Sequence, residues 1–261
     1  MLRIVSISLL LMGFVMNDLL AQYTESITSS RPGQAFTPLS VGLNALQVQT
    51  GLNLSGFSID NTPVEGDVIN YSALFRYGIK ERVEFRTGFG ISRVDTESGF
   101  SEVMFSGFSS FTVGTKINII NGSGQNPNVG IQADFALPVV DEDFRNDKVA
   151  TTLILAHTQG LTEAIGLSTN LGAAWDGNDG ETAGLYVVNI GFALPGDFGA
   201  FIETYGFFDN DDFDILFDGG FSYLVNPNLL LDISGGYGSN DTIDQFFVDF
   251  GFSWRTRFGG E

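Results

Sequence analysis

The sequence of 261 residues has no cysteine, one histidine and only 12 basic residues against 31 acidic ones. The lack of cysteine excludes a disulfide scaffold, a thiolate metal site and a lipoprotein anchor. The formal net charge of −19 argues against nucleic acid or an anionic membrane surface as a partner, because both bind clustered lysine and arginine. No Gly-x-Ser-x-Gly nucleophile elbow occurs either, and His157 is the only histidine available to a catalytic dyad.

Long apolar runs are missing beyond the N-terminus. Residues 1–21, with Arg3 ahead of an apolar stretch, are typical of a secretory signal, so we expect an exported mature chain. Every later apolar run is interrupted before the roughly 20 residues that a membrane helix needs. Because lipid-exposed backbone groups must be paired within the protein, a mature chain that enters a membrane must do so as a closed β-barrel.

Alternation of apolar and polar residues at period two is the main pattern present. In residues 246–258, Phe250, Phe252 and Trp254 share one face, whereas Asp249 and Arg255 lie on the other. Similar segments predict an all-β fold, a transmembrane antiparallel up-and-down barrel of about 12 strands. The predicted strands are 44–57, 67–79, 82–93, 105–120, 129–139, 149–159, 162–175, 183–194, 197–208, 214–225, 228–238 and 246–258. Residues 149–159 show no clear face.

The segments between the predicted strands alternate between short turns and longer loops, and the longer loops carry more than half of the acidic residues. Outer-membrane barrels keep short turns at the periplasmic rim and long loops outside. We therefore predict a periplasmic N-terminus, a barrel over residues 44–261 and the outer membrane of a Gram-negative bacterium. A secreted β-sandwich is the alternative, but it would rarely place aromatic residues on the same face of nearly every strand.

Several phrases resemble the meta-pathway of phenol degradation family, a group of outer-membrane barrel transporters. They are Ile27–Pro32, Arg76–Glu84, Asp218–Gly236 and the segment Phe201–Gly206 with Glu203. Ser30 departs from the family pattern, which has an acid before the Arg-Pro pair. The resemblance implies a barrel that transports aromatic or other hydrophobic small molecules.

A set of charged residues falls on the polar faces of the predicted strands, which should line the lumen. These ions either set the selectivity of a narrow pore or bridge one another to fill the interior. Aromatic residues on the same face could line a route for an apolar solute or pack against a plug. The predicted lumen ions are Arg76, Glu84, Arg86, Lys116, Asp134, Glu203, Asp218, Asp232, Asp249, Arg255 and Arg257, and the lumen aromatics are Phe201, Tyr205 and Phe207.

The segment 22–43 precedes the first strand and is a candidate lumen plug. Arg31 would then meet an inward acid such as Glu203 or Asp218. A mobile periplasmic tail is the competing interpretation, and the sequence leaves both open.

We predict no metal site. The acidic group Asp209, Asp211, Asp212 and Asp214 is a weak Ca²⁺ candidate, because it lacks the glycine and terminal glutamate of an EF-hand loop. We expect a monomeric, non-enzymatic barrel without a cofactor, with outer-membrane lipid and a small-molecule cargo as partners and no nucleic acid. It would pass small hydrophobic or aromatic molecules passively. An outer-membrane lipid-acting enzyme that uses His157 and a structural or adhesive barrel are the alternatives.

Overall fold

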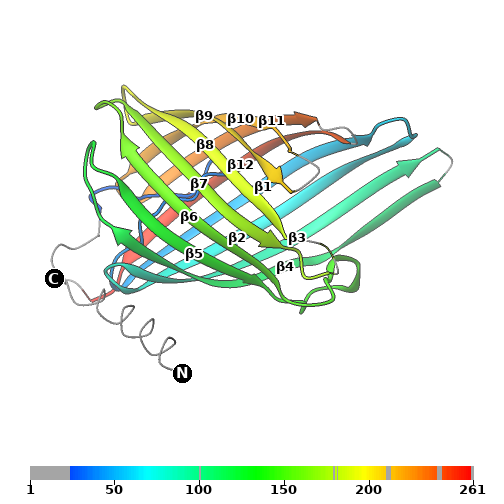
Figure 1. Cartoon of the computed structure of the whole chain (residues 1–261), viewed down its shortest axis with the longest axis horizontal. Helices are drawn as coiled ribbons and strands as arrows, with labels where there is room; N and C mark the ends of the chain where they lie inside the picture. Colours follow the sequence, from blue (N-terminus) through cyan, green and yellow to red (C-terminus); the bar gives the residue numbers. More distant parts are fainter. Residues whose placement is uncertain are drawn as a thin grey trace.

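The structure is a computed structural model that describes residues 24–99, 101–178, 180, 182–209, 213–239 and 243–259. The predicted signal sequence lies outside these described residues. Within them, twelve antiparallel strands form a closed barrel (Figure 1). Each strand pairs with its sequence neighbours, and β1 pairs with β12 to close the ring. The strands are β1 Ala45–Ile59, β2 Val64–Lys80, β3 Val83–Ser98, β4 Ser101–Ile120, β5 Asn128–Ala136, β6 Ala150–Gly160, β7 Ile165–Trp175, β8 Ala183–Leu194, β9 Phe198–Phe208, β10 Leu216–Asn226, β11 Leu229–Ser239 and β12 Ile243–Arg257.

The predicted closed barrel is thus confirmed. Apart from the strands, the described chain has one short 3-10 helix, η1 Glu142–Phe144, after β5. No helix in the described residues is long and apolar enough to cross a membrane.

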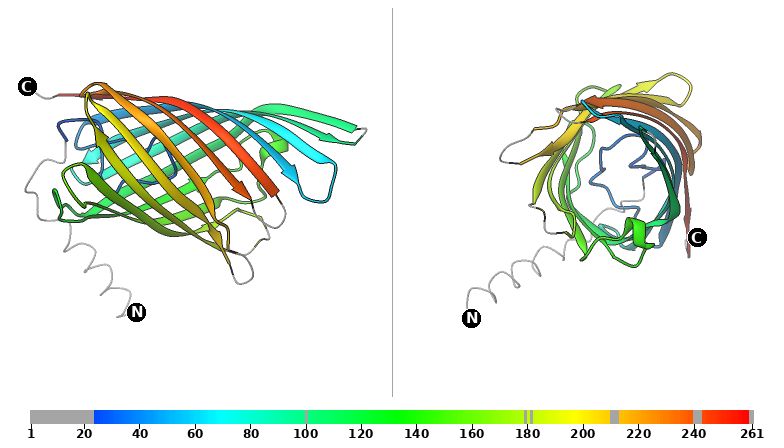
Figure 2. Two further views of the ribbon diagram at one scale, coloured as in Figure 1. Left: turned by 90° about the horizontal axis from the view of Figure 1, so that it is seen from above. Right: turned by 90° about the vertical axis from the view of Figure 1, so that its right-hand side faces the viewer.

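The outer ends of β2, β3 and β4 differ from the prediction. The sequence predicts loops for Glu65, Asp95 and Glu97, which fall outside the predicted strands 67–79 and 82–93, and places Asp67 at a predicted strand end. The structure places them in strands, with Asp67 opposite Asp95 and Glu65 opposite Glu97. Apolar cross-strand contacts sustain the pairing, since Val94 lies opposite both Val68 and Phe105. The β1–β2 and β3–β4 hairpins therefore extend beyond the other strands at one end of the barrel (Figure 2).

The two faces of the wall reverse the pattern of a soluble protein. Large apolar side chains such as Phe250, Ile233 and Leu231 are exposed on the outer face, whereas Arg76 and Lys116 are almost fully buried inside. A water-soluble β-sandwich would bury its apolar faces between two sheets. An apolar exterior around a polar interior is instead the arrangement of a transmembrane barrel.

Strand β6, which shows no clear face in the sequence, is apolar on both sides. Leu153 and Leu155 are exposed on the outer face, while Ile154 and Ala156 are buried inside. The inner pair forms a small hydrophobic cluster with Leu185 of β8, and Phe36 packs against it. The inner apolar residues of β6 therefore serve as a contact for the N-terminal segment.

The outer face generates a stability prediction at Ile233, near the middle of β11. Ile233→Arg should lower the free energy of unfolding by about 2–4 kcal/mol, because it moves a charge into the hydrocarbon. Urea unfolding in lipid vesicles measures the change, with Ile233→Val as the conservative apolar control. Equal unfolding free energies for Ile233→Arg and the wild type would contradict a lipid-facing position.

Candidate functional site

The N-terminal segment, residues 24–43, lies inside the ring of strands (Figure 2, right). Its contacts reach several parts of the inner wall. The backbone amide of Ile27 donates to the carbonyl of Pro227 at 2.8 Å, between β10 and β11. The hydroxyls of Ser29 and Ser253 of β12 are 2.7 Å apart. After the segment, the amide of Asn44 donates to Gly78 of β2 at 2.9 Å and leads into β1.

Asn170 of β7 holds the middle of the segment as a neighbouring strand would. The amide of Phe36 donates to Asn170 Oδ1 at 2.7 Å, and Asn170 Nδ2 donates to the carbonyl of Phe36 at 2.9 Å. The guanidinium of Arg86 lies 5.8 Å from the centre of the Phe36 ring. Both the backbone and the side chain of Phe36 are therefore bound by the wall.

Arg31 is the main charged anchor of the segment. Its Nη2 contacts Asp232 Oδ1 of β11 at 3.0 Å and also contacts Asp249 of β12. Burial alone disfavours the charged guanidinium, but these two carboxylates raise the pKa of Arg31 above its ordinary value. Arg31 therefore meets inward acids, as expected from the sequence, but they are Asp232 and Asp249 instead of Glu203 or Asp218.

Two glycines explain this choice of partners. Gly51 of β1 lies directly opposite Gly251 of β12. A Cβ atom at Gly51 would come within 2.5 Å of the Arg31 guanidinium, and one at Gly251 within 2.4 Å. The absence of side chains at this pair makes the space that the guanidinium occupies. Sequence reasoning missed both residues, although two glycines at inward strand positions are a usable signal for close approach.

A cation-rich cluster occupies the adjoining arc of the wall, on β2 to β5. Glu84 receives two hydrogen bonds of 2.9 Å from Arg76 Nε and Nη2, and Lys116 Nζ lies 3.6 Å from it. Arg86 Nε contacts Asp134 Oδ1 at 3.0 Å. The structure brings these five predicted lumen ions into one network that fills the interior.

The same network also binds the N-terminal segment. Arg76 donates to the carbonyls of Thr28 and Leu39 at 3.1 and 3.0 Å, and Glu84 Oε2 accepts from the amide of Val41 at 3.0 Å. These ions are therefore engaged with one another and with the segment rather than free in the lumen.

The remaining predicted lumen residues lie apart from that network. Glu203 of β9 and Asp218 of β10 are buried and face each other. Arg255 is buried near the short-turn rim, where its Nε donates to Asn228 Oδ1 at 3.1 Å. Arg257 is exposed at that rim and contacts Glu81 at 3.9 Å, so it does not line the deep lumen.

The three predicted lumen aromatics differ in burial. Phe201 is 8% exposed, Tyr205 is half-buried, and Phe207 is 49% exposed although it lies opposite the inward Leu185 of β8. Phe201 packs at the turn of the N-terminal segment, since a Cβ atom at Gly33 would come within 2.7 Å of its ring.

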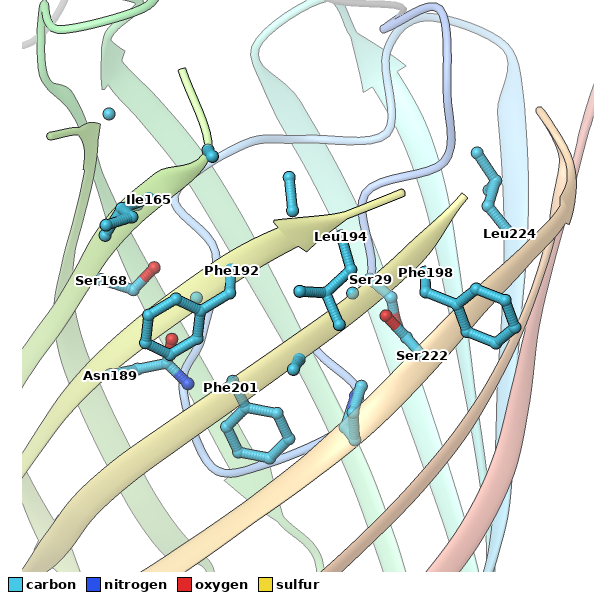
Figure 3. A pocket seen from close by; sticks show the side chains of 18 of the residues that line it. Ser29, Ile165, Ser168, Asn189, Phe192, Leu194, Phe198, Phe201, Ser222 and Leu224 are labelled. Atoms are coloured by element: carbon cyan, nitrogen blue, oxygen red, sulfur yellow. The ribbon is translucent and has the colours of Figure 1, made fainter. Parts of the chain in front are cut away.

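A cavity of about 930 Å³ lies between the N-terminal segment and the wall formed by β7 to β10 (Figure 3). Ser29, Ser30, Pro32 and Ala35 line it from the segment. Its wall carries mainly small residues at inward positions, which leave the space open. These inward lining residues are Gly166, Ser168, Asn189, Gly191, Ala193, Gly199, Phe201, Ser222 and Leu224, with Leu230 of β11 beside them. The cavity reaches the short-turn rim, because residues of the β6–β7 and β8–β9 turns also line it.

Two other candidates from the sequence lie outside this arrangement. His157 lies on the outer face near the short-turn end of β6, and its ring nitrogens contact Thr169 and Gln159 at 3.2 and 3.3 Å. Of the Ca²⁺ candidates, Asp211 and Asp212 lie outside the described residues. Among the described residues, no group of three acids, histidines or cysteines is placed to hold a metal ion.

Comparison with known families decides the relationship, because the family model described as "Putative MetA-pathway of phenol degradation" matches residues 29–256. The chain belongs to this family. The match covers nearly all of the described chain, from the N-terminal segment to the closing strand, and confirms the resemblance found in the sequence.

Solved structures show the same architecture. An outer membrane channel from Pseudomonas putida F1 matches with a TM-score of 0.68 at 11% identity, covering 87% of this chain and 100% of that chain. The transport unit of the autotransporter AIDA-I from Escherichia coli matches with a TM-score of 0.53 at 10% identity, covering 90% and 95%. At such identities the likeness establishes the fold, which is that of outer-membrane β-barrels. No curated protein matches this chain.

The ion pairs of Arg31 generate a prediction about the N-terminal segment. Arg31→Ala should lower the free energy of unfolding by about 3 kcal/mol, because it leaves one buried carboxylate, Asp232, and one half-buried carboxylate, Asp249, without their cation. It should also make residues 24–43 sensitive to added protease in reconstituted vesicles. Glu25→Ala, which removes an exposed charge from the same segment, is the control. Unchanged stability and protease resistance in Arg31→Ala would show that Arg31 does not anchor the segment.

Proposed function

We propose that this chain is a monomeric outer-membrane channel through which small, uncharged hydrophobic or aromatic molecules pass without an energy source. The observation that carries the proposal is the cavity of about 930 Å³ beside the N-terminal segment. A cavity of this size is in the range that accommodates small organic molecules. The family's description, which refers to phenol degradation, supports an aromatic cargo.

The N-terminal segment acts in this proposal as a fixed plug that narrows the lumen. It is held by ion pairs at Arg31, by backbone hydrogen bonds at Phe36 and by the cluster around Glu84. Solute then passes through the part of the cross-section that the plug leaves open, along β7 to β10. Gly166 and Gly191 border this opening, since a Cβ atom at either would meet no heavy atom closer than 3.8 Å.

The charges beside this path favour uncharged solutes. The charged residues among the described lining are Glu163 and Asp197, both acids of the short turns. The inward cations Arg31, Arg76 and Arg86 are already paired with carboxylates. A carboxylate solute would therefore lose its hydration without gaining a cationic partner, and this transfer is unfavourable.

A channel accounts for the structure better than a lipid-acting enzyme does. The contacts of His157 are the polar side chains of Thr169 and Gln159 on the outer face, away from the cavity. Closure of β1 on β12 pairs the edges of the sheet within one chain, which supports a monomer. Lipid is the partner that we infer for the apolar exterior.

The proposed path can be closed at Gly191. Gly191→Trp should reduce uptake of benzyl alcohol several-fold, because the indole would fill open space between β8 and the plug. Uptake is measured in outer-membrane vesicles from cells that produce each variant in equal amounts. Gly191→Ala, whose Cβ atom fits the available space, should keep wild-type uptake. Equal uptake by Gly191→Trp and the wild type would exclude this path.

The charge of the path gives an independent prediction. Wild-type protein should take up benzyl alcohol faster than benzoate, and Gly191→Lys should increase benzoate uptake because it supplies a cation beside the cavity. Gly191→Met provides a neutral side chain of similar length. Benzoate uptake that is equal in the Lys and Met variants would refute charge exclusion by the lining.

A further inference from the structure

Glu203 and Asp218 form a buried pair of carboxyl groups that the proposed transport path does not use. They lie directly opposite each other on β9 and β10. Glu203 is 4% exposed and Asp218 is 8% exposed. Neither carboxyl oxygen of Asp218 has a hydrogen-bond donor among the described residues.

Among the described residues, no cation forms an ion pair with either carboxyl group. From β8, Asn189 Nδ2 donates to Glu203 Oε2 at 2.9 Å, and from the plug the backbone amide of Gln34 donates to Glu203 Oε1. On β11, the residue opposite Asp218 is Gly236, which carries no side chain. A Cβ atom there would meet both the ring of Phe247 and the Cβ atom of Asp218, so apolar groups surround the pair on this side. Tyr205 is the other titratable group beside the pair. The nearest cation of the plug, Arg31, is bound to Asp232 and Asp249.

Two ionised carboxylates cannot remain in this arrangement without a large cost. Like charges directly opposite on neighbouring strands destabilise a sheet, and buried charge without a partner is unfavourable. A calcium ion would need about 6–8 oxygen ligands, whereas no described group of three or more acids, histidines or cysteines is suitably placed. A single shared proton removes the repulsion and supplies the donor that Asp218 lacks.

We propose that Glu203 and Asp218 share one proton, and that this protonated pair fastens the turn of the plug to the barrel wall. Glu203 accepts the backbone hydrogen bond of Gln34, and the preceding Gly33, with φ +91°, is packed against Phe201. Pro32 and Ala35, on either side of this turn, line the cavity. The pair therefore lies where a change in its protonation would alter the width of the path.

The direction of the effect follows from proton binding. The folded protein holds a proton that the unfolded chain releases near neutral pH, so the stability contributed by the pair decreases as pH rises. Loss of the proton places two negative charges next to each other, and their repulsion pushes the Glu203 side chain away from Asp218 and out of the position in which it accepts from Gln34. The turn then loosens, and passage beside the plug becomes easier in alkaline medium.

Infrared difference spectroscopy of the whole mature protein in lipid vesicles tests the shared proton directly. The wild type should show the carbonyl band of a protonated carboxylic acid at about pH 6 and lose it towards about pH 9. Asp218→Asn should lack the band, and Glu203→Gln provides a second variant for the same purpose. Tyr205→Phe removes the neighbouring phenol and should keep the band. A wild-type spectrum without this carbonyl band would overturn the proposal.

Thermal unfolding gives a second readout that does not depend on transport. The melting temperature of the wild type should fall by several degrees between the same two pH values. That of Asp218→Asn should change less, because an amide donates to Glu203 without titrating. A melting temperature that instead rises with added Ca²⁺ at constant pH, and does so only while Asp218 is present, would assign the pair to a metal ion and overturn the shared proton.

The transport consequence rests on the proposed function and is tested separately. Benzyl alcohol uptake should rise with pH in the wild type and remain constant in Asp218→Asn. If no variant transports any solute while the infrared band behaves as expected, the channel proposal fails and the shared proton stands. If transport occurs but shows the same pH dependence in both proteins, the pair does not control the plug.

Discussion

The hydrocarbon of a bilayer around the barrel is the constraint from which the rest of the structure follows. Lipid offers no hydrogen bonds, so the backbone groups of every spanning strand must be paired within the chain, and β1 must close on β12. The same surroundings require apolar side chains on the outer face. Polar and charged side chains are consequently concentrated in a narrow interior.

That concentration makes partners for the interior charges the second requirement. The wall does not supply them evenly, because cations gather on β2 to β4 and acids on β9 to β12. The N-terminal segment compensates on both sides. It brings Arg31 to Asp232 and Asp249, and it offers backbone carbonyls to Arg76. The segment is thus part of the electrostatic structure of the lumen.

The segment does not fill the whole cross-section. Against β2 to β5 the long side chains of the ion network occupy the interior, whereas the inward positions of β7 to β10 include Gly166, Gly191 and Gly199. Small residues on one arc and long charged residues on the other place the open space beside β7 to β10. The buried carboxyl groups of Glu203 and Asp218 lie on this arc, next to the turn of the N-terminal segment at Gln34.

The number of strands and the face of most of their residues follow from the sequence alone, because alternation at period two is a local property that a lipid boundary makes strict. Residues 149–159, which are apolar on both faces, are the exception. The sequence also identified most of the charged lumen residues. It could not show that acid-rich ends of β2 to β4 continue as strands, since cross-strand contacts such as Val68 with Val94 decide that. The partners of Arg31, the space that Gly51 and Gly251 leave for its guanidinium, and the position of the cavity are properties of the folded barrel. These properties depend on which strands the closed ring brings together around the N-terminal segment. The spacing of residues along the chain does not encode which residues of distant strands come into contact.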